Sequence, residues 1–262
     1  IALAIITIWA VITITFVLMH SVPGNPFATE NRKIPENIME NLMKKYGLDK
    51  PKSEQYIMYL KNIARFDFGE SMKQDSETVN QIIARGFPVS ARLGVQAIII
   101  ALIFGPALGA IAALYQNKAP DYISMIISII GVSVPSFVLG SFFVQFIASK
   151  VDWIPISGWG EFRHTILPSI ALALMPLAQF ARLMRSSMLE VLGQDYIKTA
   201  KSKGISRFAV IMKHAIRNAI LPVVSILGTT ISNLVAGSFV IEKIFGIPGL
   251  IQLLPLLKYN PC

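Results

Sequence analysis

Long apolar runs without a charged side chain constrain this chain more than any other feature. A helix needs about 20 mainly apolar residues to cross the hydrocarbon core of a bilayer. Four runs meet this requirement: 1–19, 93–114, 123–148 and 219–241. A fifth, 166–181, needs Leu183 and Met184 to extend it past Arg182, whose guanidinium can reach the membrane interface from a span end. We therefore expect an all-α, polytopic membrane protein with five spans.

The composition agrees with a membrane protein and excludes other classes. Hydrophobic residues make up 53% of the 262 residues and charged residues only 15%, against about 25% in soluble domains. The net charge of +9 is spread over loops, which favours positive-inside topology over nucleic-acid binding. The single cysteine, Cys262, excludes a disulfide framework and a cysteine-based metal site. Residues 1–19 could also be a signal peptide, but no A-x-A cleavage site follows them.

Basic residues in the short loops set the expected orientation, because cytoplasmic loops carry an excess of Lys and Arg. One side holds Lys118, Arg182, Arg185 and six bases of 195–222, and the other holds Lys150, Arg163, Lys243 and Lys258. Residues 188–218 are therefore predicted to be cytoplasmic. The expected organisation is a first transmembrane helix (1–22), an external helical segment (23–87) and a core transmembrane domain (88–262).

The external segment has its own helical pattern. "IPENIMENLMKKYG" has a proline near its start, apolar residues at helical spacing and Gly47 as a stop. "PKSEQYIMYLKNIARF" repeats this pattern with Tyr56, Met58, Leu60 and Ile63. We expect a small helical cap over the outer mouth.

Missing motifs narrow the function. The chain has no G-x-x-x-x-G-K-[ST], H-E-x-x-H or G-x-S-x-G, so we expect no catalytic residue, no metal site and no ATP site of its own. The five apolar cores carry no Asp, Glu, Lys or Arg, which argues against an ion-coupled transporter, although Na⁺ sites made of backbone oxygens remain open. Asp121 and Glu242 are expected to be solvated or capping residues at span ends, and His20 an interfacial side chain.

Several spans contain small residues and prolines that a simple anchor would not need. Gly105 and Gly109 form a G-x-x-x-G, which lets helices pack closely. Prolines are expected to interrupt or open spans, at Pro106, Pro135, Pro168, Pro176 and Pro222. A mildly polar line in 123–148 suggests a translocation path, formed by Ser124, Ser128, Ser133, Ser136, Ser141 and Gln145. Our candidates for residues lining it are Ser133, Ser136, Phe137 and Gln145.

The basic stretch 195–222 has helical periodicity. Gly204 should end a short helix of about 196–203, and Ser206 should cap a second one. An apolar stripe is expected on both helices, made of Ile197, Ala200, Ile205, Phe208, Met212, Ala215 and Ala219. Amphipathicity alone leaves two interpretations open, a helix lying on anionic lipid and a plug for a partner's socket.

The same stretch resembles the cytoplasmic "EAA" loop of ABC importer permeases of the oligopeptide, dipeptide, nickel and glutathione group. The matching segments are "GQDYIKTAKSKG" (193–204), "HAIRNAILP" (214–222), "SVPGNP" (21–26), "YGLDKP" (46–51), "FGES" (68–71), "VSVPSFVLG" (132–140), "WIPISG" (153–158), "LMRSSMLEVL" (183–192) and "FGIPGL" (245–250). The long external segment is similar to that of the B-type subunit. The family triplet falls on Lys198, Thr199 and Ala200, with Lys198 in place of the usual glutamate.

The resemblance implies a coupling helix at 196–204 that enters a cleft of an ATPase subunit. The contacts expected from it are Tyr196, Thr199, Ala200, Lys203 and Gly204. It implies a permease subunit of the bacterial cell membrane that imports oligopeptides, with dipeptides, nickel and glutathione as alternatives. The implied partners are a second homologous permease, two ABC ATPases, an external substrate-binding protein and membrane lipid, with no nucleic acid. The chain itself would bind no cofactor, since ATP and Mg²⁺ belong to the ATPases, and it would not be an enzyme.

Two further expectations concern the chain ends. Family members have six spans, of which we expect five here, and "IQLLPLLKYNPC" after Leu250 is expected to fall outside the resemblance. Two other readings stay open: a structural or assembly protein of the membrane, and a channel or secondary transporter that needs no ATPase.

Overall fold

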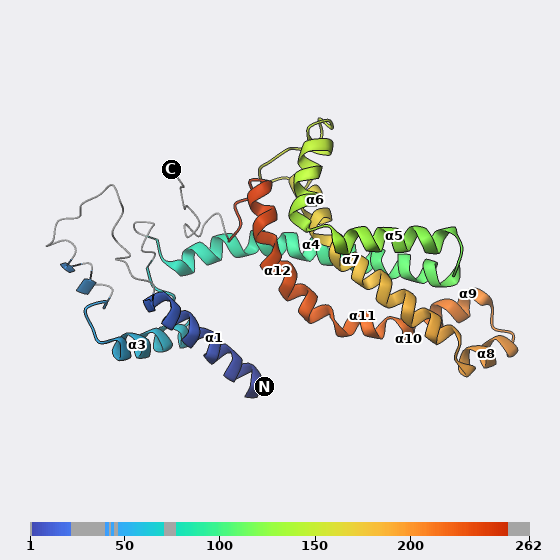
Figure 1. Ribbon diagram of the computed structural model, residues 1–262, viewed down its shortest axis with the longest axis horizontal. Coiled ribbons are helices and arrows are strands. Elements are labelled where there is room, and N and C mark those ends of the chain that lie inside the picture. The colour runs from blue at the N-terminus through green and yellow to red at the C-terminus, as the bar shows by residue number, and fades with distance from the viewer. Residues whose placement is uncertain (1, 22–39, 42, 45–46, 71–76, 251–262) are drawn as a thin grey trace. The chain divides into compact units, whose positions relative to one another are not determined.

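The computed structural model describes residues 2–21, 40–41, 43–44, 47–70 and 77–250. These residues form helices and no strand, with one isolated β-bridge between Glu70 and Thr78. The chain divides into two compact units after Gln81 (Figure 1). The all-α class predicted from the sequence is confirmed.

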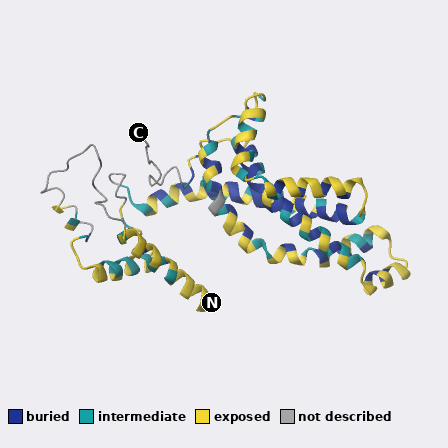
Figure 2. Cartoon of the chain, in the orientation of Figure 1, coloured by how far each residue is buried: buried dark blue, intermediate teal, exposed yellow. Residues whose placement is uncertain are grey.

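In the described part of the first unit, helices α1 and α3 pack through aromatic and polar side chains. Helix α1 (Ala2–Ser21) is exposed along most of its length, as Figure 2 shows, and Phe16 is its buried residue. The ring of Phe16 stacks against Tyr56 and Tyr59 of helix α3 (Lys52–Ala64). The ring nitrogens of His20 lie 2.9 Å from the Phe16 carbonyl oxygen and 2.9 Å from Gln55 Oε1. His20 therefore joins α1 to α3, a more specific role than the interfacial one we predicted.

Helix α3 confirms the second predicted helix of the external segment. Most of the first, "IPENIMENLMKKYG", lies outside the described residues. Gly47 does adopt a left-handed φ of 65°, as a helix stop requires.

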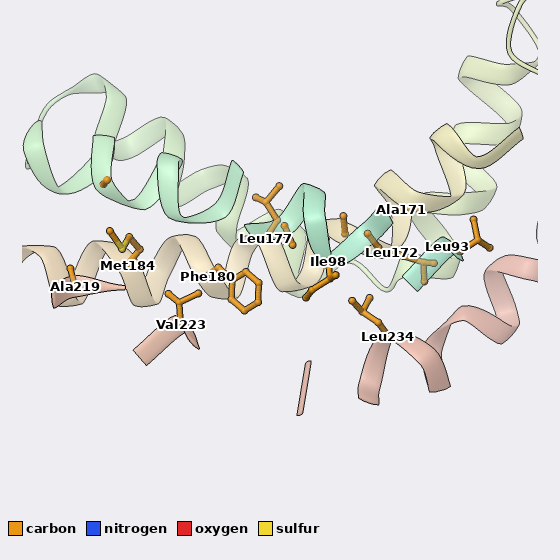
Figure 3. Packing of buried hydrophobic residues seen from close by; sticks show 14 of the residues in the cluster. Leu93, Ile98, Ala171, Leu172, Leu177, Phe180, Met184, Ala219, Val223 and Leu234 are labelled. Atoms are coloured by element: carbon orange, nitrogen blue, oxygen red, sulfur yellow. The ribbon is translucent and has the colours of Figure 1, made fainter. Parts of the chain in front are cut away.

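The second unit is a helical bundle that α7 (Arg163–Leu192) organises. Buried side chains follow α7 through Ala171, Leu172, Leu177, Phe180 and Met184, and they meet residues of α4, α11 and α12 (Figure 3). The elements of this unit besides α7 are α4 (Val79–Leu114, which begins before the division), α5 (Ala119–Ser133), α6 (Ser136–Phe143), η1 (Val144–Ala148), α8 (Asp195–Ser202), α9 (Arg207–Ala209), η2 (Val210–Ala215), α10 (Ile216–Ala219), α11 (Leu221–Ser225) and α12 (Leu227–Ile244).

Glycines bring α4 and α5 against the backbone of α7. A Cβ on Gly105 would lie 2.8 Å from the Leu177 carbonyl oxygen, and one on Gly131 would lie 2.8 Å from the Leu174 carbonyl oxygen. A Cβ on Gly109 would collide with the Ala181 carbonyl oxygen. The predicted G-x-x-x-G is thus a close packing site between α4 and α7.

The prolines behave in two ways, so our expectation about them was partly wrong. Pro106, Pro168 and Pro176 lie inside continuous helices. Pro135 does break a helix: Val134 before it is extended, with φ −93° and ψ 119°, as proline favours in the preceding residue. Pro222 opens α11 close to a second break.

The described helices include four long and apolar enough to cross a membrane, or five if one bent pair counts as a span. Ala2–Ser21, Val79–Leu114 and Arg163–Leu192 contain three predicted spans. The predicted span 123–148 is a pair of helices, Ala119–Ser133 and Ser136–Ala148, bent by 102°.

The last predicted span, 219–241, is not one continuous helix. Helices α10 to α12 divide it at Ile220 and Ile226, and by length and composition alone the preceding stretch Arg207–Ser225 is also a candidate to cross a membrane. Pro222 explains the first break, because it lacks an N–H and its ring clashes with the carbonyl group four residues earlier.

Candidate functional site

The candidate coupling segment begins where α7 ends at Leu192. Gln194 is extended, with φ −71° and ψ 149°, and its carbonyl oxygen accepts the first helical hydrogen bond of α8 from Ile197 N at 3.1 Å. Figure 1 shows α8, α9 and the turn between α4 and α5 at the same end of the second unit. The predicted short helix at 196–203 is therefore present as α8, with bounds shifted by one residue.

Gly204 ends α8 with two hydrogen bonds that glycine geometry makes available. Its φ is +75°, its N–H donates to the Lys201 carbonyl oxygen at 3.0 Å, and Ile205 N donates to the Ala200 carbonyl oxygen at 3.3 Å. This pair of bonds is a Schellman motif, which needs a left-handed residue after the helix end. The Ser206 hydroxyl then accepts from Ala209 N at 3.3 Å and caps α9, as predicted.

The two faces of α8 differ sharply. Ile197 and Ala200 are 0% and 7% exposed and pack with Val210 and Ala215 of η2 in the core. The opposite face carries Lys198, Thr199, Lys201, Ser202 and Lys203, all exposed. Among our predicted contacts, Tyr196, Thr199, Lys203 and Gly204 are thus accessible, whereas the Ala200 side chain is turned into this chain's own core.

Tyr196 fixes α8 to the helix that follows. Its hydroxyl accepts a hydrogen bond from Asn218 Nδ2 at 3.2 Å, and the same Nδ2 donates to the His214 carbonyl oxygen at 2.8 Å. With the buried Ile197, this contact holds α8 against η2 and α10. The α8 segment is therefore packed and hydrogen-bonded against the bundle rather than being a free loop.

The predicted apolar stripe over 195–222 does not form one buried face. Ile197, Ala200, Ala215 and Ala219 are buried, together with Val210, which the prediction omitted. Phe208 and Met212 are instead 74% and 48% exposed, and Ile205 is 36% exposed. Periodicity located the apolar residues but could not separate an inward set from an outward one.

A buried ion pair braces the same end of the bundle. Arg185 of α7 donates to Asp121 of α5 from Nε at 2.6 Å and from Nη2 at 2.7 Å, and Asn117 N donates to the same carboxylate at 3.0 Å. Asp121 is 1% exposed, so of the two roles predicted for it, solvated or capping, the solvated one was wrong. A bidentate pair of this kind fixes the α4–α5 turn to α7 close to the coupling segment.

Glu242 also departs from expectation. It is 0% exposed in α12, and neither carboxylate oxygen has a hydrogen-bond partner within the described part of the chain. Gly249 lies against this carboxylate so closely that a Cβ would collide with it. No sequence signal distinguished Glu242 from an exposed residue at a helix end.

The residues proposed for a translocation path lie on both sides of a helix break. Ser133 and Ser136 flank the break at Pro135, while Phe137 and Gln145 are exposed beyond it. Ser124 and Ser128 are buried within the bundle, where the Ser124 hydroxyl donates to the Leu108 carbonyl oxygen at 3.3 Å. The bend of 102° thus divides the predicted polar line. The described residues also contain no group of His, Cys, Asp and Glu that could hold a metal ion.

Comparison with known protein families shows to which family this chain belongs. A family model described as "Binding-protein-dependent transport system inner membrane component" matches residues 105–260, and the model of its N-terminal part matches residues 1–94. The chain belongs to this family. Its membership, together with the candidate spans, makes the chain a multi-pass protein of the inner membrane.

Individual relatives within the family are similar along most of their length. The dipeptide transport system permease protein DppB of Bacillus subtilis (strain 168) is 50% identical over 244 residues, covering 93% of this chain and 79% of the relative. The oligopeptide transport system permease proteins OppB of Haemophilus influenzae (strain ATCC 51907 / DSM 11121 / KW20 / Rd) and Escherichia coli (strain K12) are each 43% identical. The alignment with the Haemophilus influenzae protein covers 94% of this chain and 81% of the relative. The alignment with the Escherichia coli protein covers 95% of this chain and 82% of the relative.

The resemblance to importer permeases seen in the sequence is confirmed, including its similarity to B-type subunits. One detail was wrong: the family match continues to residue 260, so it does not end at Leu250. The predicted coupling contacts and path residues remain predictions.

Proposed function

We propose that this chain is a permease subunit of an ATP-driven importer of peptides, either oligopeptides or dipeptides. Permeases named for these substrates are 43–50% identical to it, which supports the peptide class over nickel and glutathione. A second homologous permease would complete the path, and an external binding protein would deliver the substrate. Two ABC ATPases would bind ATP and Mg²⁺, so the chain itself would need no cofactor and catalyse no reaction.

The observation that carries this proposal is the geometry of α8. It projects at the end of α7, its inner face is buried, and Tyr196 ties it to α10 through Asn218. A movement of a partner bound to its outer face would therefore reach the membrane helices rather than be absorbed by a flexible loop. Rigid elements of this kind transmit a population shift between two bundle arrangements.

Two different surfaces of 195–222 support the two interpretations left open for it. Phe208 and Met212 are large, apolar and exposed one helical turn apart, with Arg207 and Lys213 beside them, which suits an anionic lipid interface. The outer face of α8 is polar and basic, which does not suit burial in lipid. We assign the α9–η2 surface to lipid and the outer face of α8 to the ATPase.

The test compares substitutions on α8 with a matched one elsewhere. Thr199→Trp adds bulk to the middle of its exposed face, and Lys203→Glu reverses a charge there. Lys118→Glu reverses an exposed charge in the α4–α5 turn and is the control. ATPase co-purification and ATP-dependent uptake of a labelled dipeptide and tripeptide are measured with the cognate binding protein.

Both α8 variants should reach the membrane yet lose co-purifying ATPase and at least about tenfold of uptake, equivalent to 1.4 kcal/mol of docking energy. The control should keep both. Unchanged uptake in the α8 variants would refute docking through α8. Uptake that follows an ion gradient without ATP would instead establish the secondary-transporter reading, and uptake of Ni²⁺ or glutathione in place of peptides would refute the substrate class.

A further inference from the structure

A groove whose lining includes several polar side chains lies between α7 and the junction of α11 with α12. Its volume is about 520 Å³, within the range of sites that hold small ligands. Its lining residues are Gln179, Arg182, Leu183, Ile226, Thr229, Thr230 and Asn233. Five of these seven side chains are polar, although both walls belong to apolar helices.

The position of these polar side chains along the helices makes them significant. Within the predicted span 219–241, Asn233 precedes the external Lys243 by ten residues, or about 15 Å at 1.5 Å per residue, so this span places it near the middle of a core of about 30 Å. Arg182 follows Arg163 by about 28 Å on the same rise, which places it towards the predicted cytoplasmic side. The groove therefore runs from mid-membrane towards the cytoplasm.

Lipid cannot satisfy these groups. Thr229 and Asn233 are exposed on the surface of this chain, and a hydrocarbon core supplies no hydrogen-bond partner. Polar side chains at such depth face water, another protein chain or a pathway. The surface between α7 and α12 therefore does not face lipid.

The amide and guanidinium donors of the groove are free, whereas its two hydroxyl donors are not. The hydroxyl groups of Thr229 and Thr230 each donate a hydrogen bond to the Ile226 carbonyl oxygen at 2.9 Å. Their oxygens therefore act as acceptors towards the groove. The side chains of Gln179, Arg182 and Asn233 have no hydrogen-bond or ion-pair partner among the described residues.

Arg182 differs in this respect from its neighbour Arg185. One turn further along α7, the charge of Arg185 is neutralised by Asp121. No carboxylate lines the groove, so the guanidinium of Arg182 gives it an uncompensated positive charge.

This set of groups matches the end of a peptide. A guanidinium presents two parallel N–H donors to a carboxylate, and the amides of Gln179 and Asn233 can both donate to and accept from a peptide main chain. We propose that the groove is the cytoplasmic half of one wall of the translocation path, where Arg182 binds the C-terminal carboxylate of the passing peptide. This inference rests on the proposed function and adds the substrate group recognised inside the membrane.

The experiment uses the complete transporter in proteoliposomes, with ATP inside and saturating loaded binding protein outside. Uptake of a tripeptide is compared with uptake of the same tripeptide carrying a C-terminal amide, for wild type, Arg182→Gln and Arg182→Lys. Ser186→Gln, an exposed position of α7 that does not line the groove, is the matched control. Because the binding protein is unchanged, a change in the ratio of the two rates arises in the permease.

Arg182→Gln should lower uptake of the free acid about tenfold and leave uptake of the amide unchanged, because one charge-assisted contact is lost. Arg182→Lys should keep part of the preference, and Ser186→Gln all of it. An equal fall for both peptides with loss of permease pairing would overturn the inference and identify the groove as a surface covered by the second permease.

Unchanged rates for both peptides would also overturn it, since Arg182 would then only contact lipid headgroups. Failure of the proposed function is a separate result: the wild-type transporter would then take up neither peptide.

Discussion

Asp121 and Arg185 form a bidentate ion pair across 64 positions of sequence, with N–O distances of 2.6 and 2.7 Å. The Asp121 side chain is 2% exposed and the Arg185 side chain 24%. The pair joins the α4–α5 turn to α7. Because both side chains are largely shielded from solvent, water could not take the place of a partner that was removed.

Asp121→Asn should destabilise the protein by about 3 kcal/mol, because it leaves the guanidinium of Arg185 without its counter-charge. Thermal unfolding in detergent measures this loss. Asp195→Asn is the matched control: it breaks the exposed Asp195–Lys198 pair of 2.9 Å and should cost less than about 1 kcal/mol. Equal effects of the two substitutions would show that burial does not strengthen the Asp121 pair.

Gly109 allows α4 to approach α7 and should not tolerate even a methyl group. A Cβ there would collide with the Ala181 carbonyl oxygen and lie 2.8 Å from the Met184 Cβ. Gly109→Ala should therefore cost about 1–3 kcal/mol through overpacking, measured as a fall in Tm. Gly228→Ala is the opposite control, because its Cβ would meet nothing within 4 Å in helix α12. That change should stabilise the helix by about 0.5–1 kcal/mol, and a fall in its Tm would contradict the packing argument.

Local chemistry explains which features the sequence predicted well. Gly204 ends α8 and Ser206 caps α9 because both effects depend on the residue itself and its immediate neighbours. The long apolar runs likewise predicted α1, α4 and α7 without knowledge of their partners.

Features that depend on distant partners could not be predicted in this way. Pro135 and Pro176 look equivalent in sequence, yet only the first breaks its helix, whereas α7 continues through Pro176, which is itself buried. Asp121 showed no sign of its partner 64 residues away. Ala200 and Phe208 belonged to one periodic stripe, but tertiary packing buried the first and exposed the second.

Gly204 should be sensitive to backbone conformation rather than to side-chain size. A Cβ there would meet nothing within 4 Å, but its φ of +75° is unfavourable for other residues by about 1–2 kcal/mol. Gly204→Ala should therefore loosen the end of α8, seen as faster amide exchange at Ile205 and reduced peptide uptake. Gly204→Asn should be milder, since asparagine tolerates this region. Gly193→Ala is the control, because Gly193 has an ordinary φ of −80° and should accept alanine without loss of uptake.

Substitutions of Glu242 test whether its buried carboxylate affects stability through its charge or only through the space that it fills. Glu242→Gln keeps the size of the side chain and removes its charge, which has no partner among the described residues. The Tm should therefore stay unchanged or rise, because burying an unpaired charge is costly. Glu242→Ala should lower stability by about 2–4 kcal/mol, since it empties the space beside Gly249. Lys243→Gln, at the exposed neighbouring position, should have no effect. A Tm several degrees lower in Glu242→Gln would show that the carboxylate is bound by a group outside the described residues, and Gly249→Ala would then weaken the same contact.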